Sequence, residues 1–141
     1  MEGPAIKAED VINKDGFYIF VDDTASFIKT VFFTARFPCE LLWISECHTT
    51  AGTGAGSVTL QLEKLTGTQA PGAGANMLNT AFDLKGTANT VVLKGTTDLT
   101  VDTTLAEGDR IALKYSGTLT SLVGVQVTLY CKPLGRGLYR V

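Results

Sequence analysis

Strict alternation of apolar and polar residues is the sequence feature that most limits how this chain can fold. In residues 58–63 (VTLQLE) every second residue is apolar, and the pattern recurs in 110–115 (RIALKY) and 123–132 (VGVQVTLYCK). A period of two is typical of a β-strand that buries one face and leaves the other in water. In the last segment we expect one face to lie in the core, made of Val123, Val125, Val127, Leu129 and Cys131.

Turn-forming residues separate these segments throughout the chain. The sequence contains 15 glycines and 20 threonines, and few stretches lack both. Threonine suits a pleated, half-exposed surface, while glycine accepts the positive φ angles of tight turns. We expect further strands over residues 17–21, 30–37, 41–48 and 90–94. Residues 77–84 remain open between a strand and a short helix, because their apolar residues also fit helical spacing.

About eight short strands without a fixed-length repeat predict an all-β protein, an antiparallel β-sandwich. Eight strands favour a jelly-roll-like arrangement, and an immunoglobulin-type sandwich is the alternative. The chain has 141 residues, enough for one domain with its own core. We expect an N-terminal arm over residues 1–16, the sandwich over 17–132, and a tail over 133–141 that leaves the last strand at Pro133.

Composition excludes several classes of protein. Hydrophobic residues make up 45% of the chain, charged residues 18%, and the net charge is −2. A disordered chain would need low hydrophobicity and high net charge. Binding of nucleic acid through bulk positive charge is not expected at a pI near 5.3. No run of about 18 apolar residues is present, so we expect no membrane partner.

Cysteine and histidine give little reason to expect a metal site. The three cysteines, Cys39, Cys47 and Cys131, are an odd number, and we expect them to be buried, reduced thiols. A zinc site would have to combine them with His48, the only histidine. Cys47 and His48 are adjacent in an expected strand, so their side chains point to opposite faces. We therefore expect no metal.

Three other sequence patterns bear on possible chemistry. The glycine-rich residues 52–57 (GTGAGS) lack the Gly-Lys-Ser/Thr of a phosphate loop and lead into a strand. A serine or cysteine nucleophile would need His48 as its base, and nothing in the sequence places one beside it. We expect no enzyme, no catalytic residue and no cofactor. Calcium sites in sandwich loops have no short signature, so these acidic pairs stay open as an alternative: Asp22–Asp23, Asp98 with Asp102, and Glu107 with Asp109.

Aromatic residues supply the best indication of a partner. Phe32 and Phe33 are consecutive in an expected strand and must face opposite sides of a sheet, and we expect Phe32 to point away from the core. A strand that is apolar on both faces needs a cover, which is either another chain or a loop of the same chain. Arginine and tyrosine are favoured in interfaces. The predicted interface residues are Phe32, Trp43, Arg136, Tyr139 and Arg140.

Residues 104–130 (TLAEGDRIALKYSGTLTSLVGVQVTLY), with 51–68 (AGTGAGSVTLQLEKLTGT), carry a resemblance that covers about a third of the chain. They resemble small jelly-roll virion proteins of tailed bacteriophages, namely the decoration or head auxiliary proteins of the capsid exterior and related fibre-base domains. The turn at 108–111 (GDRI) and the strand that closes the chain are also similar to the end of trimeric C1q-like jelly rolls.

This resemblance implies a non-enzymatic structural protein. It implies a homotrimer that is made in the host cytoplasm, binds the major capsid protein at the outer capsid surface of the virion and stabilises the capsid. It transfers no catalytic residues. The alternative function is a carbohydrate- or receptor-binding β-sandwich module of a phage fibre, for which Trp43 is the only tryptophan available.

Overall fold

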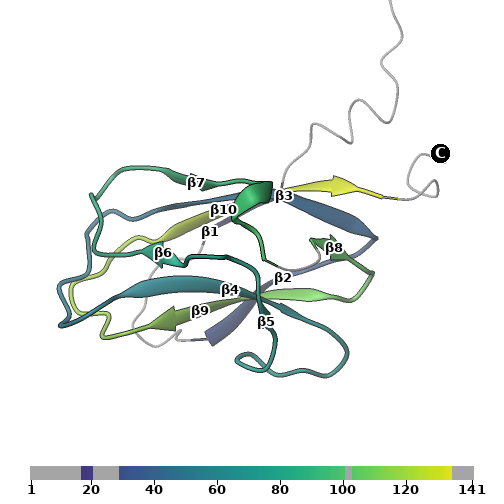
Figure 1. Cartoon of the computed structure of the whole chain (residues 1–141), viewed down its shortest axis with the longest axis horizontal. Helices are drawn as coiled ribbons and strands as arrows, with labels where there is room; N and C mark the ends of the chain where they lie inside the picture. Colours follow the sequence, from purple (N-terminus) through teal and green to yellow (C-terminus); the bar gives the residue numbers. More distant parts are fainter. Residues whose placement is uncertain (1–16, 21–28, 101–102, 135–141) are drawn as a thin grey trace, which may run out of the picture.

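The computed structural model describes residues 17–20, 29–100 and 103–134 of the chain. Within these residues, ten β-strands form two five-stranded antiparallel sheets that pack face to face, as Figure 1 shows. The all-β sandwich predicted from the alternating segments is therefore confirmed. The described residues contain no helix long and apolar enough to cross a lipid bilayer.

Each sheet has two long strands at its centre. Sheet A contains, in spatial order, β1 (Phe17–Phe20), β10 (Gln126–Pro133), β3 (Cys39–Cys47) and β7 (Val92–Lys94), with β8 (Thr104–Leu105) also paired to β3. Sheet B contains β2 (Lys29–Thr34), β9 (Arg110–Ser116), β4 (Thr59–Leu65) and β5 (Ala75–Asn76), with β6 (Phe82–Asp83) also paired to β4. In Figure 1 sheet A is the upper layer and sheet B the lower one.

The strand order is that of a jelly roll. Strands β5 and β6 share β4 as their partner, and β7 and β8 share β3, so each pair occupies one position in its sheet. With each pair counted once, the ten strands fill eight positions, which read 1-8-3-6 in sheet A and 2-7-4-5 in sheet B. This order is the double Greek key of a jelly roll, the arrangement that eight strands favoured.

The core lies between the sheets and is built by the predicted alternation. In β4 the buried Leu60 and Leu62 lie opposite Tyr115 and Leu113 of β9, whose own inward residues include Ile111. Sheet A contributes an equivalent row from β3 and β10, in which Ile44 and Leu129 are paired and fully buried, and Leu41, Val127 and Cys131 complete the row.

Two expected elements differ in the structure. The last strand begins at Gln126, because Gly124 takes a positive φ of +69° and turns the chain before it. Val123 is therefore 50% exposed and does not lie on the apolar face, whereas Val125, Val127, Leu129 and Cys131 are buried as predicted. Residues 77–84 form no helix: they pass along the edge of sheet B and contribute the short strand β6.

One side of the sandwich is closed by residues 95–100. This segment leaves β7 as a short 3-10 helix, η1 (Thr96–Asp98), and crosses towards sheet B. Leu99 forms a bridge with Leu78, and the Thr100 amide donates to the Met77 carbonyl at 2.9 Å. The two sheets are thus joined by backbone hydrogen bonds at this side, next to the free edge of β7.

We predict that Gly117→Ala strongly destabilises the protein. Gly117 has a φ of +92°, a conformation that favours glycine, and a Cβ there would collide with the Ser57 carbonyl oxygen. The expected loss is about 2 kcal/mol or more of unfolding free energy, seen as a lower melting temperature. Gly95→Ala is the matched control, since Gly95 has an ordinary φ and open space around it. Equal melting temperatures for the two variants would contradict this account of the 117 turn.

Candidate functional site

An apolar strip along the edge of sheet A is the most unusual surface of the molecule. Among the described residues, the exposed large apolar side chains are Val91, Val92, Leu93 and Val123, with exposed fractions of 66%, 42%, 62% and 50%. The first three are consecutive and lie at or just before β7. Single exposed apolar residues are common on protein surfaces, whereas three consecutive ones form an exposed apolar patch.

Strand β7 is also an edge. It pairs on one side with β3, where Val92 lies opposite Glu46 and Leu93 opposite Ser45, and it ends the spatial order of sheet A. Proteins usually protect such an edge with a charged side chain or a proline, because its backbone groups can pair with another strand. The charge available here is Lys94, whose ammonium group lies 5.3 Å from the centroid of the Phe82 ring. Lys94 is thus drawn towards sheet B, and the three residues before it are apolar.

Aromatic side chains lie on the outer face of the same sheet. Trp43 lies opposite Tyr130 on β10, and the two rings stack with centroids 5.5 Å apart and planes 6° from parallel. A register shift at Leu42 lets Leu41 and Ile44 both face the core while Trp43 faces outward. Trp43 is therefore a half-buried part of the outer face, which is where the sequence placed an interface residue.

The other predicted interface residues have different outcomes. Phe32 lies at the register shift of β2 and packs, partly buried, against the core. The expectation that Phe32 points away from the core is therefore wrong. Its neighbour Phe33 is the core residue, with 7% exposed. Arg136, Tyr139 and Arg140 lie outside the described residues. The sequence did not single out Val91, Val92 or Leu93, although residues 90–94 were an expected strand.

The only histidine of the chain is buried inside the sandwich. His48 is 2% exposed, its Nδ1 lies 2.9 Å from Oε1 of Glu46, and its Nε2 lies 3.2 Å from the Gly86 carbonyl oxygen. A carbonyl oxygen can only accept, so Nε2 carries a hydrogen. In the neutral ring Nδ1 is then the acceptor, and the hydrogen of the shared bond comes from a protonated Glu46.

The surroundings of Glu46 favour that protonated form. Burial raises the pKa of the Glu46 carboxyl, and the bond to His48 opposes the shift only in part. Oε2 of Glu46 is buried without a hydrogen-bond partner in the described part of the chain. Since both ring nitrogens of His48 are occupied inside the protein, this histidine holds the loop at Gly86 and is not placed to activate a nucleophile at the surface.

The cysteines are distributed over both faces of sheet A. All three are free thiols, and Cys39 and Cys131 face the core and are fully buried, as expected. Cys47 differs from the expectation: it is half-buried, because alternation along β3 places it on the outer face. The hydrogen bond between the two buried thiols, together with burial, raises the pKa of Cys131, which keeps it neutral. In the described residues no three His, Cys, Asp or Glu side chains gather where they could hold one metal ion.

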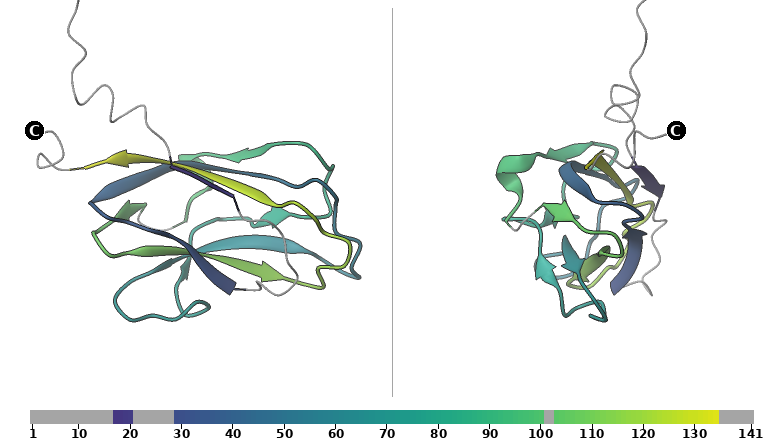
Figure 2. Two further views of the ribbon diagram at one scale, coloured as in Figure 1. Left: turned by 180° about the vertical axis from the view of Figure 1, so that it is seen from behind. Right: turned by 90° about the vertical axis from the view of Figure 1, so that its right-hand side faces the viewer.

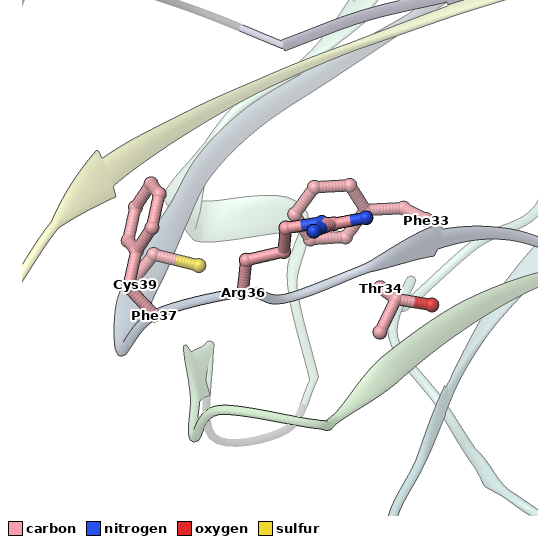
Figure 3. A pocket seen from close by; sticks show the side chains of 5 residues that line it. All are labelled: Phe33, Thr34, Arg36, Phe37 and Cys39. Atoms are coloured by element: carbon pink, nitrogen blue, oxygen red, sulfur yellow. The ribbon is translucent and has the colours of Figure 1, made fainter.

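A small pocket opens where the chain crosses from β2 to β3. It has a volume of about 200 Å³, and Figure 3 shows the side chains around it: Phe33, Thr34, Arg36, Phe37 and Cys39. Its lining is mainly apolar, and Arg36 is the only ionisable group besides the buried Cys39 thiol. No His, Asp, Glu, Lys or Tyr side chain lines this pocket, and the Cys39 thiol is fully buried.

The glycine-rich residues 52–57 do not form a phosphate-binding loop. The amide groups of Gly52 and Thr53, which a phosphate would need as donors, already donate to carbonyl oxygens of the loops beside them. The carbonyl oxygens of Gly54 and Gly56 accept from the Lys85 ammonium group at 2.9 and 3.0 Å. The loop is thus a structural turn that holds a lysine.

Acidic residues in the described loops stabilise turns. Asp98 accepts from the Gly95 amide and Asp109 from the Ala106 amide, both at 2.9 Å. The other members of the acidic pairs are Glu107, which is exposed, and three residues outside the described ranges, Asp22, Asp23 and Asp102.

A second glycine-rich loop, residues 66–74 between β4 and β5, covers part of the outer face of sheet B and lies below the lower sheet in both views of Figure 2. The buried carboxylate of Glu63 accepts from the amides of Gly72 and Gly74. Arg110 donates from Nη2 to the Gly67 and Gln69 carbonyl oxygens at 3.0 and 2.8 Å. Sheet B is therefore partly covered by its own chain, whereas the β7 edge of sheet A carries the exposed apolar strip.

Comparisons with protein-family models, curated protein sequences and solved structures find no match to this chain.

We predict that Glu46→Gln changes how stability depends on pH. A glutamate whose folded pKa is raised contributes stability that is fully present below its unfolded pKa of about 4.3 and is lost as the pH rises through the folded value. The glutamine amide can donate to Nδ1 at every pH, so the variant should gain stability relative to the wild type between pH 4.5 and 8. Urea unfolding across that range measures the difference, with the more exposed Glu40→Gln as control. Curves for wild type and Glu46→Gln that stay parallel would rule out a raised pKa.

Proposed function

We propose that this protein is a non-enzymatic structural component of a tailed-phage virion, a decoration protein that binds the major capsid protein on the outer capsid surface. The observation that carries the proposal is the exposed apolar strip Val91–Leu93 at the edge of sheet A, where β7 pairs with β3 alone among the described residues. An exposed apolar edge favours a protein that works through contacts with other chains. The sequence resemblance of residues 51–68 and 104–130 supplies the class of partner.

The fold suits a mechanical role. Antiparallel strands with a closed apolar core form a rigid body, and the longer loops that could move are attached to the sheets by hydrogen bonds from Arg110, Lys85 and the Gly72 amide. A rigid subunit transmits load between its contacts without deforming. In the form implied by the resemblance, three copies associate around a three-fold axis, so each contact is repeated by symmetry.

Stabilisation of the capsid would come from many weak contacts acting together. Each subunit adds a modest interaction, but copies attached to the same shell rebind before they can diffuse away. A weak, apolar contact of the kind that the β7 edge offers is sufficient under these conditions. A hydrophobic strip on a free monomer would otherwise be a liability for aggregation.

We expect the protein to be found on particles and to stabilise them. Purified particles of the phage that encodes this chain should contain it in many copies, and particles assembled without it should release DNA at a lower temperature. Adding back the purified chain should restore the release temperature, whereas an unrelated protein of similar size should not. Absence of the chain from purified particles would refute the proposal.

A second candidate function rests on the aromatic pair of sheet A. Trp43 and Tyr130 place two parallel rings on an outer sheet face, and aromatic rings are suited to stacking on sugar rings. On this alternative the chain is a carbohydrate- or receptor-binding module of a phage fibre.

If so, the wild-type chain should bind at least one glycan on an array, and Trp43→Ala should weaken that binding at least tenfold (about 1.4 kcal/mol). Val123→Ala, which truncates an exposed apolar residue elsewhere, should leave it unchanged. Thermal melting shows whether each variant is folded. A wild-type chain that binds no glycan contradicts the alternative.

A further inference from the structure

We propose that two copies of the protein pair through β7, strand against antiparallel strand, about a two-fold axis that passes beside Val92. This inference names the contact behind the self-association put forward above and rests on that proposed function. A three-fold ring is held by head-to-tail contacts, whereas a contact of β7 with itself is two-fold. The β7 contact would therefore join a subunit of one trimer to a subunit of the next.

The residues around β7 are complementary to themselves. When residues 90–94 (TVVLK) pair antiparallel about Val92, Val92 lies opposite Val92 of the second copy, and Val91 lies opposite Leu93. Lys94 then lies opposite Thr90, so no like charges face each other across the contact. Directly opposed apolar pairs stabilise a sheet, and directly opposed like charges destabilise it. The strand thus favours one register with a second copy of itself.

The available surface matches this register. Leu93 lies opposite Ser45 in the existing sheet. Val91 precedes β7 and would lie on the same side as Leu93 once the paired strand extends to it. Their exposed fractions of 62% and 66% leave most of both side chains to be covered. In the pair, two copies of each residue would form one continuous apolar row across the joint, and the two five-stranded sheets would become one of ten strands.

Lys94 is positioned so that it does not block the approach. Its ammonium group lies near the Phe82 ring, on the side of β7 that faces sheet B. Residues 95–100, which contain η1, are hydrogen-bonded to residues 76–79 beside sheet B. One of these bonds runs from the Asn79 amide to the Asp98 carbonyl oxygen at 2.8 Å. These bonds hold the segment that follows β7 against residues 77–79.

The contact is small by the standard of stable interfaces. Specific complexes bury roughly 800 Å² on each partner, which is more than the five residues 90–94 provide. We therefore expect weak pairing in dilute solution and full pairing where the local concentration is high, as on a crowded shell.

Thiol cross-linking tests the register directly. In a Cys47→Ser background, which removes the half-buried thiol of the outer face, Val92→Cys should form a disulfide-linked dimer on mild oxidation. Val91→Cys alone should link at least tenfold more slowly, because its opposite residue is Leu93. Mixing Val91→Cys with Leu93→Cys should restore fast linking. Equal rates at positions 91 and 92, or no dimer at position 92, would overturn the proposed pairing.

Charge insertion tests the contact without thiols. Sedimentation over a wide concentration range should show reversible self-association of the full chain, and Leu93→Lys should weaken it at least tenfold. Val123→Lys is the matched control, since it adds the same charge at a site with a similar exposed fraction outside β7. Both variants should melt close to the wild type, because both side chains are exposed. A wild type that stays monomeric, or equal effects of the two variants, would contradict the proposal.

The outcomes separate this inference from the proposed function. If the chain is present on particles but the thiols at position 92 never link, the β7 contact is wrong and the virion role stands. If they link in solution but the chain is absent from particles, the contact stands and the virion role is wrong. Linking of position 92 to a different virion protein would overturn a second copy as the occupant of this edge.

Discussion

The antiparallel pairing of β3 with β10 is the contact on which the rest of the structure depends. It joins two strands separated by most of the chain, and every other strand of sheet A is attached to one of them: β1 to β10, and β7 and β8 to β3. Bringing such distant segments together lowers the entropy of the chain, which opposes folding. Burial of inward apolar pairs such as Ile44 with Leu129 against sheet B offsets this loss.

The same strand pair sets the orientation of Trp43 at the surface and of Glu46 in the interior. The register shift near Leu42 allows β3 to bury Leu41 and Ile44 while Trp43 faces outward and stacks on Tyr130. At the far end of β3, alternation carries Glu46 inward beneath the loops, where His48 meets it. A shift of one residue in this register would exchange the buried and exposed sets.

Polar side chains then attach the loops to the sheets. Glu46 and His48 hold the loop at Gly86, while Glu63 and Arg110 hold the glycine-rich loop that covers sheet B. His48, Glu63 and Arg110 are hydrogen-bonded to backbone groups, and Glu46 is bonded to the ring of His48, which offsets part of the cost of removing these groups from water. With the loops held in this way, sheet B is partly covered, whereas the apolar edge of sheet A has one neighbouring strand, β3, among the described residues. The proposed contacts with other chains rest on this difference.

Alternation in the sequence was sufficient to predict two packed antiparallel sheets, and it placed Leu60, Leu62, Ile111 and Leu113 in the core, because a period of two is a local property of the strands. It failed at Val123, where Gly124 turns the chain and breaks the phase. It also could not show that Glu63 and His48 are buried, since their covers come from loops distant in sequence. Residues 90–94 were recognisable as a strand, but only the tertiary structure decided that this strand is an edge with its apolar side chains in water. Whether a strand has one neighbour or two depends on long-range pairing, which no local pattern of residues encodes.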